Sequence, residues 1–239
     1  MIVSSKAIVI SKLKYKDNDL IIKCYTENQG VLSFMAKGVL SSKKGKLKPA
    51  YFQPLTLLSI QFDYKPNKGL QFFKTVRNDY HFQTLHSAIL KSTVVLFLAE
   101  ILNMVLKEEE SNPLLFQYLE TALIWFDTVN SDGLFHHKFL MELTKFLGFY
   151  PDDSNNQRSY FDLEEGAYQH VKTGPYTISK DKLVLFNSIL GTKFDKKYDK
   201  PMSSVQKQEL LNMIILYFKL HLQGFKSPKS LAILNQVFG

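Results

Sequence analysis

The sequence predicts an α+β chain, with a small closed five-stranded barrel over residues 1–80 and an all-α domain over residues 81–239. Three observations carry this prediction. Segments with apolar residues at every second position fill the first 80 residues and indicate short strands. From about Phe82 onward, the apolar residues recur at helical spacing instead. The positive charge of the chain is confined to the part that is expected to form strands.

The charge distribution indicates a polyanion-binding module at the beginning of the chain. The 239 residues carry a formal charge of +8. Residues 1–80 contain 14 Lys and Arg against 5 Asp and Glu, a net charge of +9, and the remaining residues have a net charge of −1. Such asymmetry is typical of proteins that bind nucleic acid. An anionic membrane is a poorer partner, because the basic part reads as strands rather than as an amphipathic helix.

Five strands are expected, and two of them contain a slip in the apolar alternation. Their ranges are 2–16, 20–26, 31–37, 54–64 and 70–77. The slips fall between Ser11 and Lys12 and between Leu57 and Leu58, where bulged and strongly bent strands are expected. Bends of this kind indicate barrel closure. The long loop between the third and fourth strands is typical of an oligonucleotide-binding barrel, or OB-fold, but the pattern alone also fits an SH3-like barrel.

Helical spacing continues to the end of the chain, with one interruption. Helices are expected from about 82 to 107, 113 to 129, 134 to 147, 182 to 190 and 203 to 222, with a short one after Pro228. Asn112 and Pro113 form an N-terminal helix signal, and Ser203 with Gln206 forms a capping-box pattern. Residues 150–180 are polar and rich in turn residues, so we expect an irregular insertion with a hairpin around Glu165-Gly166.

Motifs for catalysis are missing from the sequence. It has no HExxH, GxGxxG, P-loop or GxSxG motif, and the single Cys24 excludes a disulfide framework or a cysteine-based zinc site within the chain. We therefore expect a protein that is not an enzyme, with no catalytic residue, no metal and no cofactor. The N-terminal residues lack a signal-peptide pattern, and no apolar run reaches the roughly 20 residues of a membrane span. These features predict a cytoplasmic protein.

The basic side chains of the barrel are the candidate DNA-binding residues. They are Lys14, Lys37, Lys43, Lys44, Lys46, Lys48, Lys74 and Arg77. Lysines neutralise phosphates, and an exposed aromatic residue among them can stack on a base. The aromatic residues interleaved with this set are Tyr15, Phe34, Tyr51 and Phe73. The alternative is that the lysine-rich loop at 43–48 is an ordinary solvated surface loop and that the aromatic residues belong to the core.

Several segments together resemble the RecO-type family of bacterial DNA repair proteins. Near the start, YKDNDLIIKCYTENQGVLSFMAKGV is similar to the opening of that family, including the Ala36-Lys37-Gly38 segment. The stretches FLAEILNMVLKEEESNPLLFQYLETAL, FLMELTKFLGFYP and LLNMIILYFKLHLQGFKSPKSL resemble its helices. This sequence differs from many members of the family at two places. Four residues intervene between Gly38 and Lys43, where many members have further basic residues, and the four-cysteine zinc module of many members is absent from residues 150–180.

The resemblance implies an OB-fold barrel followed by a helical domain, in the zinc-free branch of the family. It also implies a nucleoid-associated mediator of DNA repair and homologous recombination. Such a protein binds single- and double-stranded DNA, anneals complementary strands and helps to load the recombinase onto strands coated by single-stranded-DNA-binding protein. The implied partners are a RecR-type protein and the acidic C-terminal tail of the single-stranded-DNA-binding protein. Alternatives are an RNA-binding barrel, a helical protein-interaction scaffold and, more distantly, a hydrolase.

One helix face is a candidate site for that acidic tail, because its binding requires cations beside an apolar groove. Lys138 and Met141 lie three residues apart and Met141 and Lys145 four apart, so they share a face of the expected third helix. His137 directly precedes Lys138 and completes the candidate set. The alternative is that Met141 belongs to the core and that the lysines are solvated.

Overall fold

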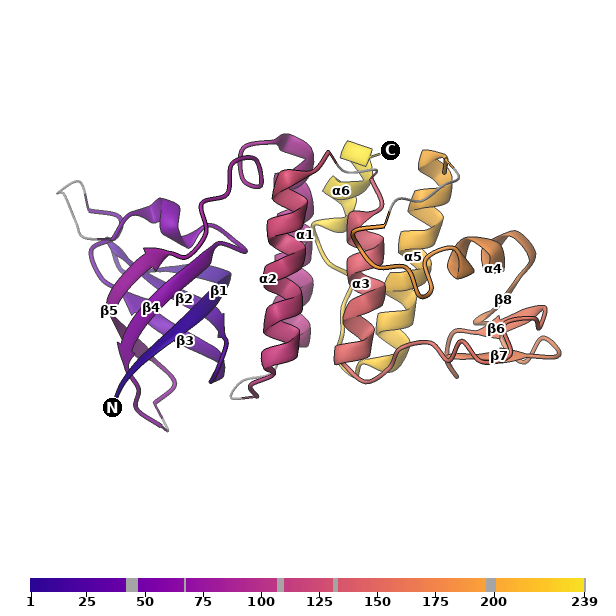
Figure 1. Cartoon of the computed structure of the whole chain (residues 1–239), viewed down its shortest axis with the longest axis horizontal. Coiled ribbons are helices and arrows are strands. Elements are labelled where there is room, and N and C mark those ends of the chain that lie inside the picture. The colour runs from indigo at the N-terminus through magenta and orange to yellow at the C-terminus, as the bar shows by residue number, and fades with distance from the viewer. Residues whose placement is uncertain (42–46, 67, 107–109, 131–132, 197–200, 239) are drawn as a thin grey trace. The chain divides into compact units, whose positions relative to one another are not determined.

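The computed structural model describes residues 1–41, 47–66, 68–106, 110–130, 133–196 and 201–238 (Figure 1). Two compact units can be distinguished: a first unit, Met1–Val129, and a second unit, Asn130–Gly239. The first unit joins the strands to the first pair of helices. The change from strands to helices falls near residue 80 as expected, whereas the domain boundary placed there remains a prediction.

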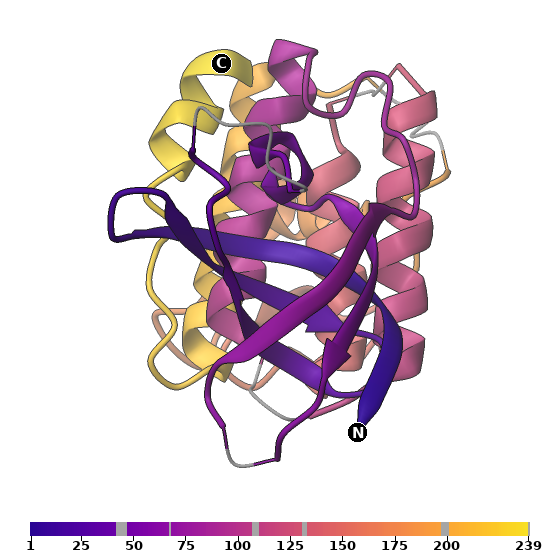
Figure 2. The ribbon, with the colours of Figure 1, turned by 90° about the vertical axis from the view of Figure 1, so that its left-hand side faces the viewer.

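The first unit contains the predicted closed barrel. Its strands are β1 (Ile2–Tyr15), β2 (Asp19–Thr26), β3 (Gly30–Ala36), β4 (Leu57–Asp63) and β5 (Gln71–Asn78). Their order around the barrel is β1-β2-β3-β5-β4, and β1 pairs with β4 to close it (Figure 2). The strands β3 and β5 run parallel, with Phe34 beside Gln71 and Met35 beside Phe72. This order is that of an OB-fold barrel, and it decides between the two barrel classes that the sequence left open.

The barrel interior is filled by apolar side chains from all five strands, with aromatic rings at its centre. The ring of Phe34 packs edge-on against Phe62 at 5.0 Å and stacks on Phe73 at 4.4 Å, both measured between ring centroids. A short 3-10 helix, η1 (Pro49–Phe52), adds the fully buried Phe52, whose ring stacks on Phe73 at 5.8 Å. The segment between β3 and β4 therefore contributes to the core after the basic loop has ended.

Of the two predicted slips, one lies close to an irregularity in strand pairing and the other does not. In β1 the register shifts between Val9 and Ser11, slightly before the expected site. The slip expected between Leu57 and Leu58 is wrong, because β4 pairs with β1 in regular register there. Leu58 belongs to the barrel core, whereas Leu57 pairs with Ile8 on the outer face and is also buried. Adjacent apolar residues that are buried on opposite faces of a strand therefore produce the same sequence pattern as a slip in the alternation.

Two helices, α1 (Ile89–Val105) and α2 (Pro113–Thr128), complete the first unit. On the outer face of the barrel, the buried Tyr25 packs its ring against Phe116 of α2 at 6.0 Å. The hydroxyl of Tyr25 donates to the carbonyl of Asn112 at 3.2 Å. Asn112 is the predicted N-cap of α2, and its side chain accepts from the Leu115 N–H at 3.0 Å. The helical pair thus covers one side of the barrel.

The helix α1 begins seven residues later than predicted because a distant carboxylate holds the preceding segment in a turn. Both carboxylate oxygens of Asp127 accept backbone N–H groups, from Gln83 at 2.9 Å and from Thr84 and Leu85 at 2.7 Å each. The Lys91 ammonium donates to the Asp127 carbonyl at 2.7 Å. The apolar periodicity that begins at Phe82 therefore includes residues of this buried turn.

Gly30, at the start of β3, is required both by its backbone conformation and by a close neighbour. Its φ is +64°, in the left-handed region that favours glycine. A Cβ atom at this position would lie 2.6 Å from the carbonyl oxygen of Glu110. The turn between β2 and β3 therefore packs directly against the backbone that precedes α2.

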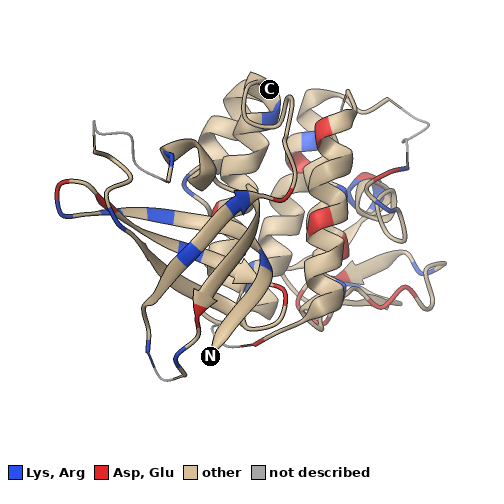
Figure 3. Ribbon diagram, turned by 60° about the vertical axis from the view of Figure 1, so that its left-hand side comes forward, with Lys and Arg blue, Asp and Glu red and all other residues tan. Residues whose placement is uncertain are grey.

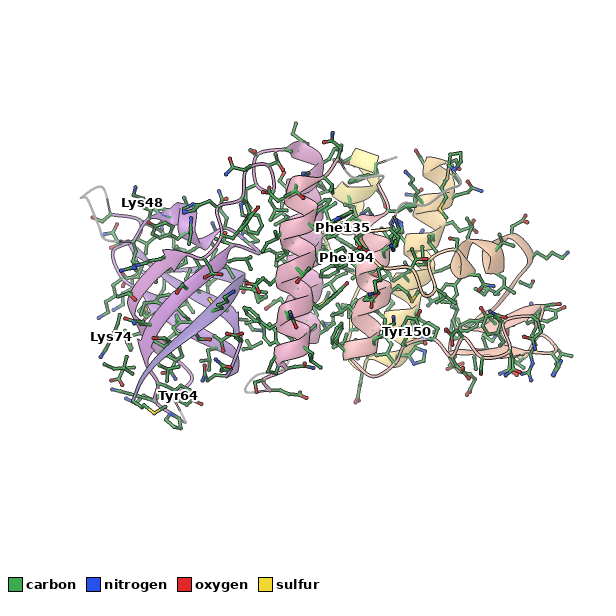
Figure 4. All side chains as sticks on the ribbon, viewed as in Figure 1. Lys48, Tyr64, Lys74, Phe135, Tyr150 and Phe194 are labelled. Carbon is green, nitrogen blue, oxygen red and sulfur yellow. The ribbon has the colours of Figure 1, made fainter. Side chains whose placement is uncertain are left out.

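The second unit contains four helices and a small sheet in its described part. They are α3 (Phe135–Phe146), β6 (Tyr160–Asp162), β7 (Ala167–Gln169), β8 (Thr177–Ser179), α4 (Lys180–Asn187), α5 (Ser204–His221) and α6 (Leu231–Phe238). The capping box of Ser203 and Gln206 is confirmed at the start of α5. In Figure 4 the labelled Phe135 and Phe194 approach each other, with ring centroids 6.3 Å apart.

The insertion at residues 150–180 is more ordered than the sequence predicts. The expected hairpin is confirmed as β6 and β7, with Gly166 at φ +67° in the turn, and β8 adds a strand on the other side of β6. The buried Asp162 holds this sheet together, because its carboxylate accepts from the hydroxyl groups of Thr173 and Thr177 at 2.5 and 3.0 Å. None of the described helices is long and apolar enough to span a membrane.

Candidate nucleic-acid interface

The described candidate cations of the barrel all point into solvent. Lys14, Lys37, Lys48, Lys74 and Arg77 are exposed. Among the described residues, none of these five forms an ion pair within 4 Å. Figure 3 shows Lys and Arg along the strands and loops of the barrel. Lys43, Lys44 and Lys46 lie outside the described residues.

Nearby acidic side chains are occupied elsewhere. Asp19 accepts the Gly38 N–H at 2.8 Å, and Asp63 pairs with the N-terminal ammonium at 3.1 Å. Asp79 pairs with Lys6 at 3.3 Å. Three of the five acidic residues in the first 80 positions are therefore engaged by groups other than the candidate cations. This arrangement leaves the positive charge of the barrel available to an external anion.

A hollow of about 260 Å³ lies between β3 and β5, where the two strands pair in parallel. It is lined by Met35, Lys37, Leu47, Phe72, Phe73 and Lys74. The Phe72 side chain is 50% exposed, and the Lys37 ammonium lies 5.5 Å from the centroid of its ring. A cation over an exposed aromatic ring, beside a second lysine, provides both a stacking surface for a base and charges for the adjoining phosphates.

β5 has a bulge at Lys74, one of the residues that line this hollow. Phe73 pairs with Phe62, and Thr75 pairs with Gln61, so Lys74 is an extra residue without a pairing position on β4. A bulge of this kind redirects a side chain and increases the local twist. Strand alternation already places Lys74 on the exposed side with Phe72, while Phe73 packs into the aromatic core. The bulge shifts the alternation after it, so that Val76 is buried and Arg77 is exposed.

The remaining described cations extend the basic surface beyond the hollow. Lys14 pairs with Leu20, which pairs in turn with Ala36, the residue before Lys37. Lys14 and Lys37 are thus two strand spacings apart, about 10 Å. Arg77 lies further along β5, where it pairs with Ser59. Lys48 precedes η1, and Figure 4 shows it at one end of the barrel, apart from Lys74.

Phe72 was missed by sequence reasoning, although the sequence contains a signal for it. Adjacent residues in a strand point to opposite faces, so Phe72 and Phe73 cannot both enter the barrel interior. The interleaved aromatic residues that were expected instead differ in exposure. Phe34 is fully buried, Tyr51 and Phe73 are partly buried, and Tyr15 is exposed at the end of β1.

The proposed tail-binding face of α3 is largely interior to the second unit. Its residues do share one face, but His137, Lys138 and Met141 are buried. The Lys138 ammonium donates to the carbonyl of Lys196, and His137 Nε2 lies 2.8 Å from the carbonyl oxygen of Lys207. Met141 therefore belongs to the core, as the alternative held, whereas Lys138 is not a solvated lysine.

Lys145 is the exposed member of that set, and it already has partners on its own surface. Its ammonium lies 3.2 Å from Glu142 and 4.6 Å from the centroid of the Tyr150 ring. The face therefore presents one exposed cation, Lys145, while its other three members are buried.

Metal-binding side chains do not gather in the described part of the chain. Three or more His, Cys, Asp or Glu residues that could hold a metal ion are not found together there. Cys24 is fully buried in the barrel core, and burial raises the pKa of its thiol. Asp162, one of the carboxylates of the insertion, is bonded to threonine hydroxyl groups and to backbone N–H groups.

The fold and the surface together define a class of protein: a basic OB-fold barrel, with an exposed aromatic residue, attached to helices. Comparisons with known proteins agree with this class. Residues 1–78 match the family Recombination protein O N terminal, and residues 86–231 match Recombination protein O C terminal.

Similar proteins extend over the whole chain. It is 42% identical to the DNA repair protein RecO of Flavobacterium johnsoniae and 41% identical to that of Flavobacterium psychrophilum, each over 238 residues and 100% of both chains. The corresponding protein of Bacteroides fragilis is 34% identical over 242 residues, again with 100% of both chains covered. The chain belongs to the RecO family of DNA repair proteins.

Proposed function

We propose that this RecO-family protein binds single- and double-stranded DNA through its barrel and anneals complementary strands. The observation that carries the proposal is the hollow between β3 and β5, where Lys37 and Lys74 surround the exposed Phe72. Lysines that lack carboxylate partners neutralise phosphates, and an exposed ring stacks on an unpaired base. Annealing requires no covalent chemistry, because a surface that neutralises two backbones allows base pairing to select the product.

The proposal includes partners that act on coated DNA. We infer that the protein acts at the nucleoid in the cytoplasm, together with a RecR-type protein. We also infer that it contacts the acidic tail of the single-stranded-DNA-binding protein, and thereby helps to load the recombinase. The resemblance and the family membership support these partners. Because the candidate face of α3 is mostly buried, the proposal does not place the tail on that helix.

Replacing Lys43, Lys44, Lys46 and Lys48 together with Ala tests whether the basic loop contributes to the interface. Single-strand binding releases counterions at about 0.7 per neutralised phosphate. Because this variant removes four cations that would neutralise phosphates, the slope of log affinity against log salt is expected to become less steep by about 3. The measurement is fluorescence anisotropy of a labelled oligonucleotide over a range of salt concentrations. An unchanged slope would exclude the loop from the DNA contact.

A competition experiment separates this function from the RNA-binding alternative. Matched DNA and RNA oligonucleotides of the same sequence differ in the 2′-hydroxyl, which lets a protein distinguish RNA. We expect the DNA strand to compete at least as well as the RNA strand for the labelled DNA complex. A clear preference for RNA would favour the alternative, and salt-insensitive binding of both would favour a protein-interaction scaffold.

A further inference from the structure

A second cavity in the first unit has a different chemistry from the basic hollow. It lies at the end of β5, has a volume of about 290 Å³ and is near the lower limit of typical ligand pockets. Its lining includes Thr56, Asn78, Tyr80, Phe82 and Gln83. The lining contains no Lys, Arg, Asp or Glu, so the cavity suits a neutral polar molecule rather than a phosphate.

Two polar atoms in the wall of this cavity lack a partner among the described residues. They are the hydroxyl oxygen of Thr56 and the side-chain oxygen of Asn78, and both atoms are buried. Thr56 as a whole is only 4% exposed. A buried polar atom without a hydrogen bond costs about 1–3 kcal/mol, so such atoms in native proteins commonly mark a bound group. Side-chain rotation on binding would turn both groups toward a ligand.

Aromatic side chains supply the apolar part of the same wall. The rings of Tyr80 and Phe82 meet edge to face with centroids 5.1 Å apart, and those of Phe82 and His86 meet likewise at 5.6 Å. Tyr80 and Phe82 are only partly buried. A cavity that combines aromatic rings with amide and hydroxyl groups matches a planar heterocycle with polar edges.

The backbone around Thr56 is held in a strained conformation. The preceding Leu55 is fully buried and has a φ of +59°, which is rare for a residue with a large side chain. The Leu55 N–H donates to the Val9 carbonyl at 2.7 Å, and the Val9 N–H donates to the Thr56 carbonyl at 3.0 Å. Strain that is fixed in this way is common at ligand-binding positions, and here it fixes the backbone that carries Thr56.

Exposed cations lie close in sequence to two of the residues that line the cavity. Arg77 directly precedes Asn78, and Lys48 lies two residues before Ala50, which also lines the cavity. A nucleotide with its base in the cavity would therefore keep its phosphates near positive charges outside it. We propose that this cavity receives one unpaired nucleobase of a bound single strand. The capture of a single base fixes the strand on the barrel and leaves its neighbours open for pairing.

This inference rests on the proposed DNA binding, and photochemical crosslinking tests it. The probe is a thymidine oligonucleotide with one 5-iodouracil, irradiated in complex with the full chain. Crosslinks are expected at Tyr80, His81 or Phe82, and the double variant Thr56→Val, Asn78→Ala should reduce their yield several-fold with an unchanged salt slope. The control variant Val171→Ala, at an exposed position of the second unit, should retain these crosslinks.

The outcomes separate the inference from the function beneath it. Normal oligonucleotide binding without crosslinks at residues 80–82, or with a yield that the double variant leaves unchanged, would overturn the nucleobase site alone. Absence of oligonucleotide binding by the wild-type protein would overturn the site together with the proposed function. Thr56→Val serves as a folding control, because loss of an unpartnered hydroxyl should leave the melting temperature unchanged or higher.

Discussion

Replacing Lys37, Lys74 and Arg77 together with Ala is expected to weaken single-strand binding on the order of 100-fold at low salt. Each exposed cation contributes up to about 1 kcal/mol to an ionic contact, and three such losses amount to about 3 kcal/mol. The salt slope should also become less steep by about 2, since three phosphate contacts disappear. Anisotropy titrations of a labelled oligonucleotide measure both quantities.

The control for this variant removes the same charge from the second unit. Lys172, Lys193 and Lys219 are exposed there, and their joint replacement with Ala changes the net charge equally. If binding depends on the barrel surface, this control should retain wild-type affinity apart from a small nonspecific decrease. Equal losses in the two triple variants would show that overall charge, rather than the barrel face, determines DNA binding.

The Asp127→Ala variant is expected to lose about 3 kcal/mol of stability in the first unit. Its carboxylate accepts the buried N–H of Leu85 and the partly buried N–H groups of Gln83 and Thr84. An N–H that loses its acceptor costs about 1–3 kcal/mol when it is buried and less when water can reach it, so the three losses together amount to about 3 kcal/mol. Urea denaturation followed by the fluorescence of Trp125, the single tryptophan of the chain, reports on this unit. Asp195→Ala, at an exposed position of the second unit, should leave that transition unchanged.

This contribution should also depend on pH in a defined direction. Burial alone would raise the pKa of Asp127, but the backbone N–H groups of residues 83–85 and the Thr84 hydroxyl hold it below its ordinary value. A carboxyl with a lowered pKa stabilises the folded state above its unfolded pKa of about 3.9 and loses this effect as the pH falls further. The stability difference between wild type and Asp127→Asn should therefore shrink below about pH 4. A difference that stays constant down to pH 3 would contradict the assignment.

The sequence predicted the elements whose pattern is local. Alternation located all five barrel strands, and the signals at Asn112 and Ser203 located the starts of α2 and α5. The bend in β1 was also visible, although the slip predicted between Ser11 and Lys12 falls slightly after the register shift between Val9 and Ser11. These features depend on neighbours within a few residues.

Features that depend on distant residues could not be derived in this way. The turn at residues 83–85, which delays the start of α1, is held by Asp127, more than 40 residues further along the chain, and periodicity carries no trace of this contact. Leu57 and Leu58 point to opposite faces of β4, and both are buried because helices cover part of the barrel. The spacing of Lys138 and Met141 indicated one face correctly, but their partners in the second unit determine that this face is internal.

The sequence predicted which residues form the candidate site better than it predicted how they are arranged. Lys37, Lys74 and Arg77 are exposed on the barrel as the charge distribution indicated. Strand alternation alone places Lys74 on the same side as Phe72. The exposure of Arg77 depends on the bulge between β4 and β5, which the sequence does not specify. The uncharged cavity beside Thr56 and Asn78 left no signal, because its polar residues come from separate segments.

Strand annealing on coated DNA is the most direct test of the central claim that this chain binds and pairs single strands. Two complementary oligonucleotides, one carrying a fluorophore and the other a quencher, are first coated with the cognate single-stranded-DNA-binding protein and then mixed. Wild-type protein is expected to accelerate quenching well beyond the spontaneous rate, and the Lys37, Lys74, Arg77 variant should lose most of this acceleration. An unaccelerated rate with wild-type protein, or full acceleration by the triple variant, would contradict the account.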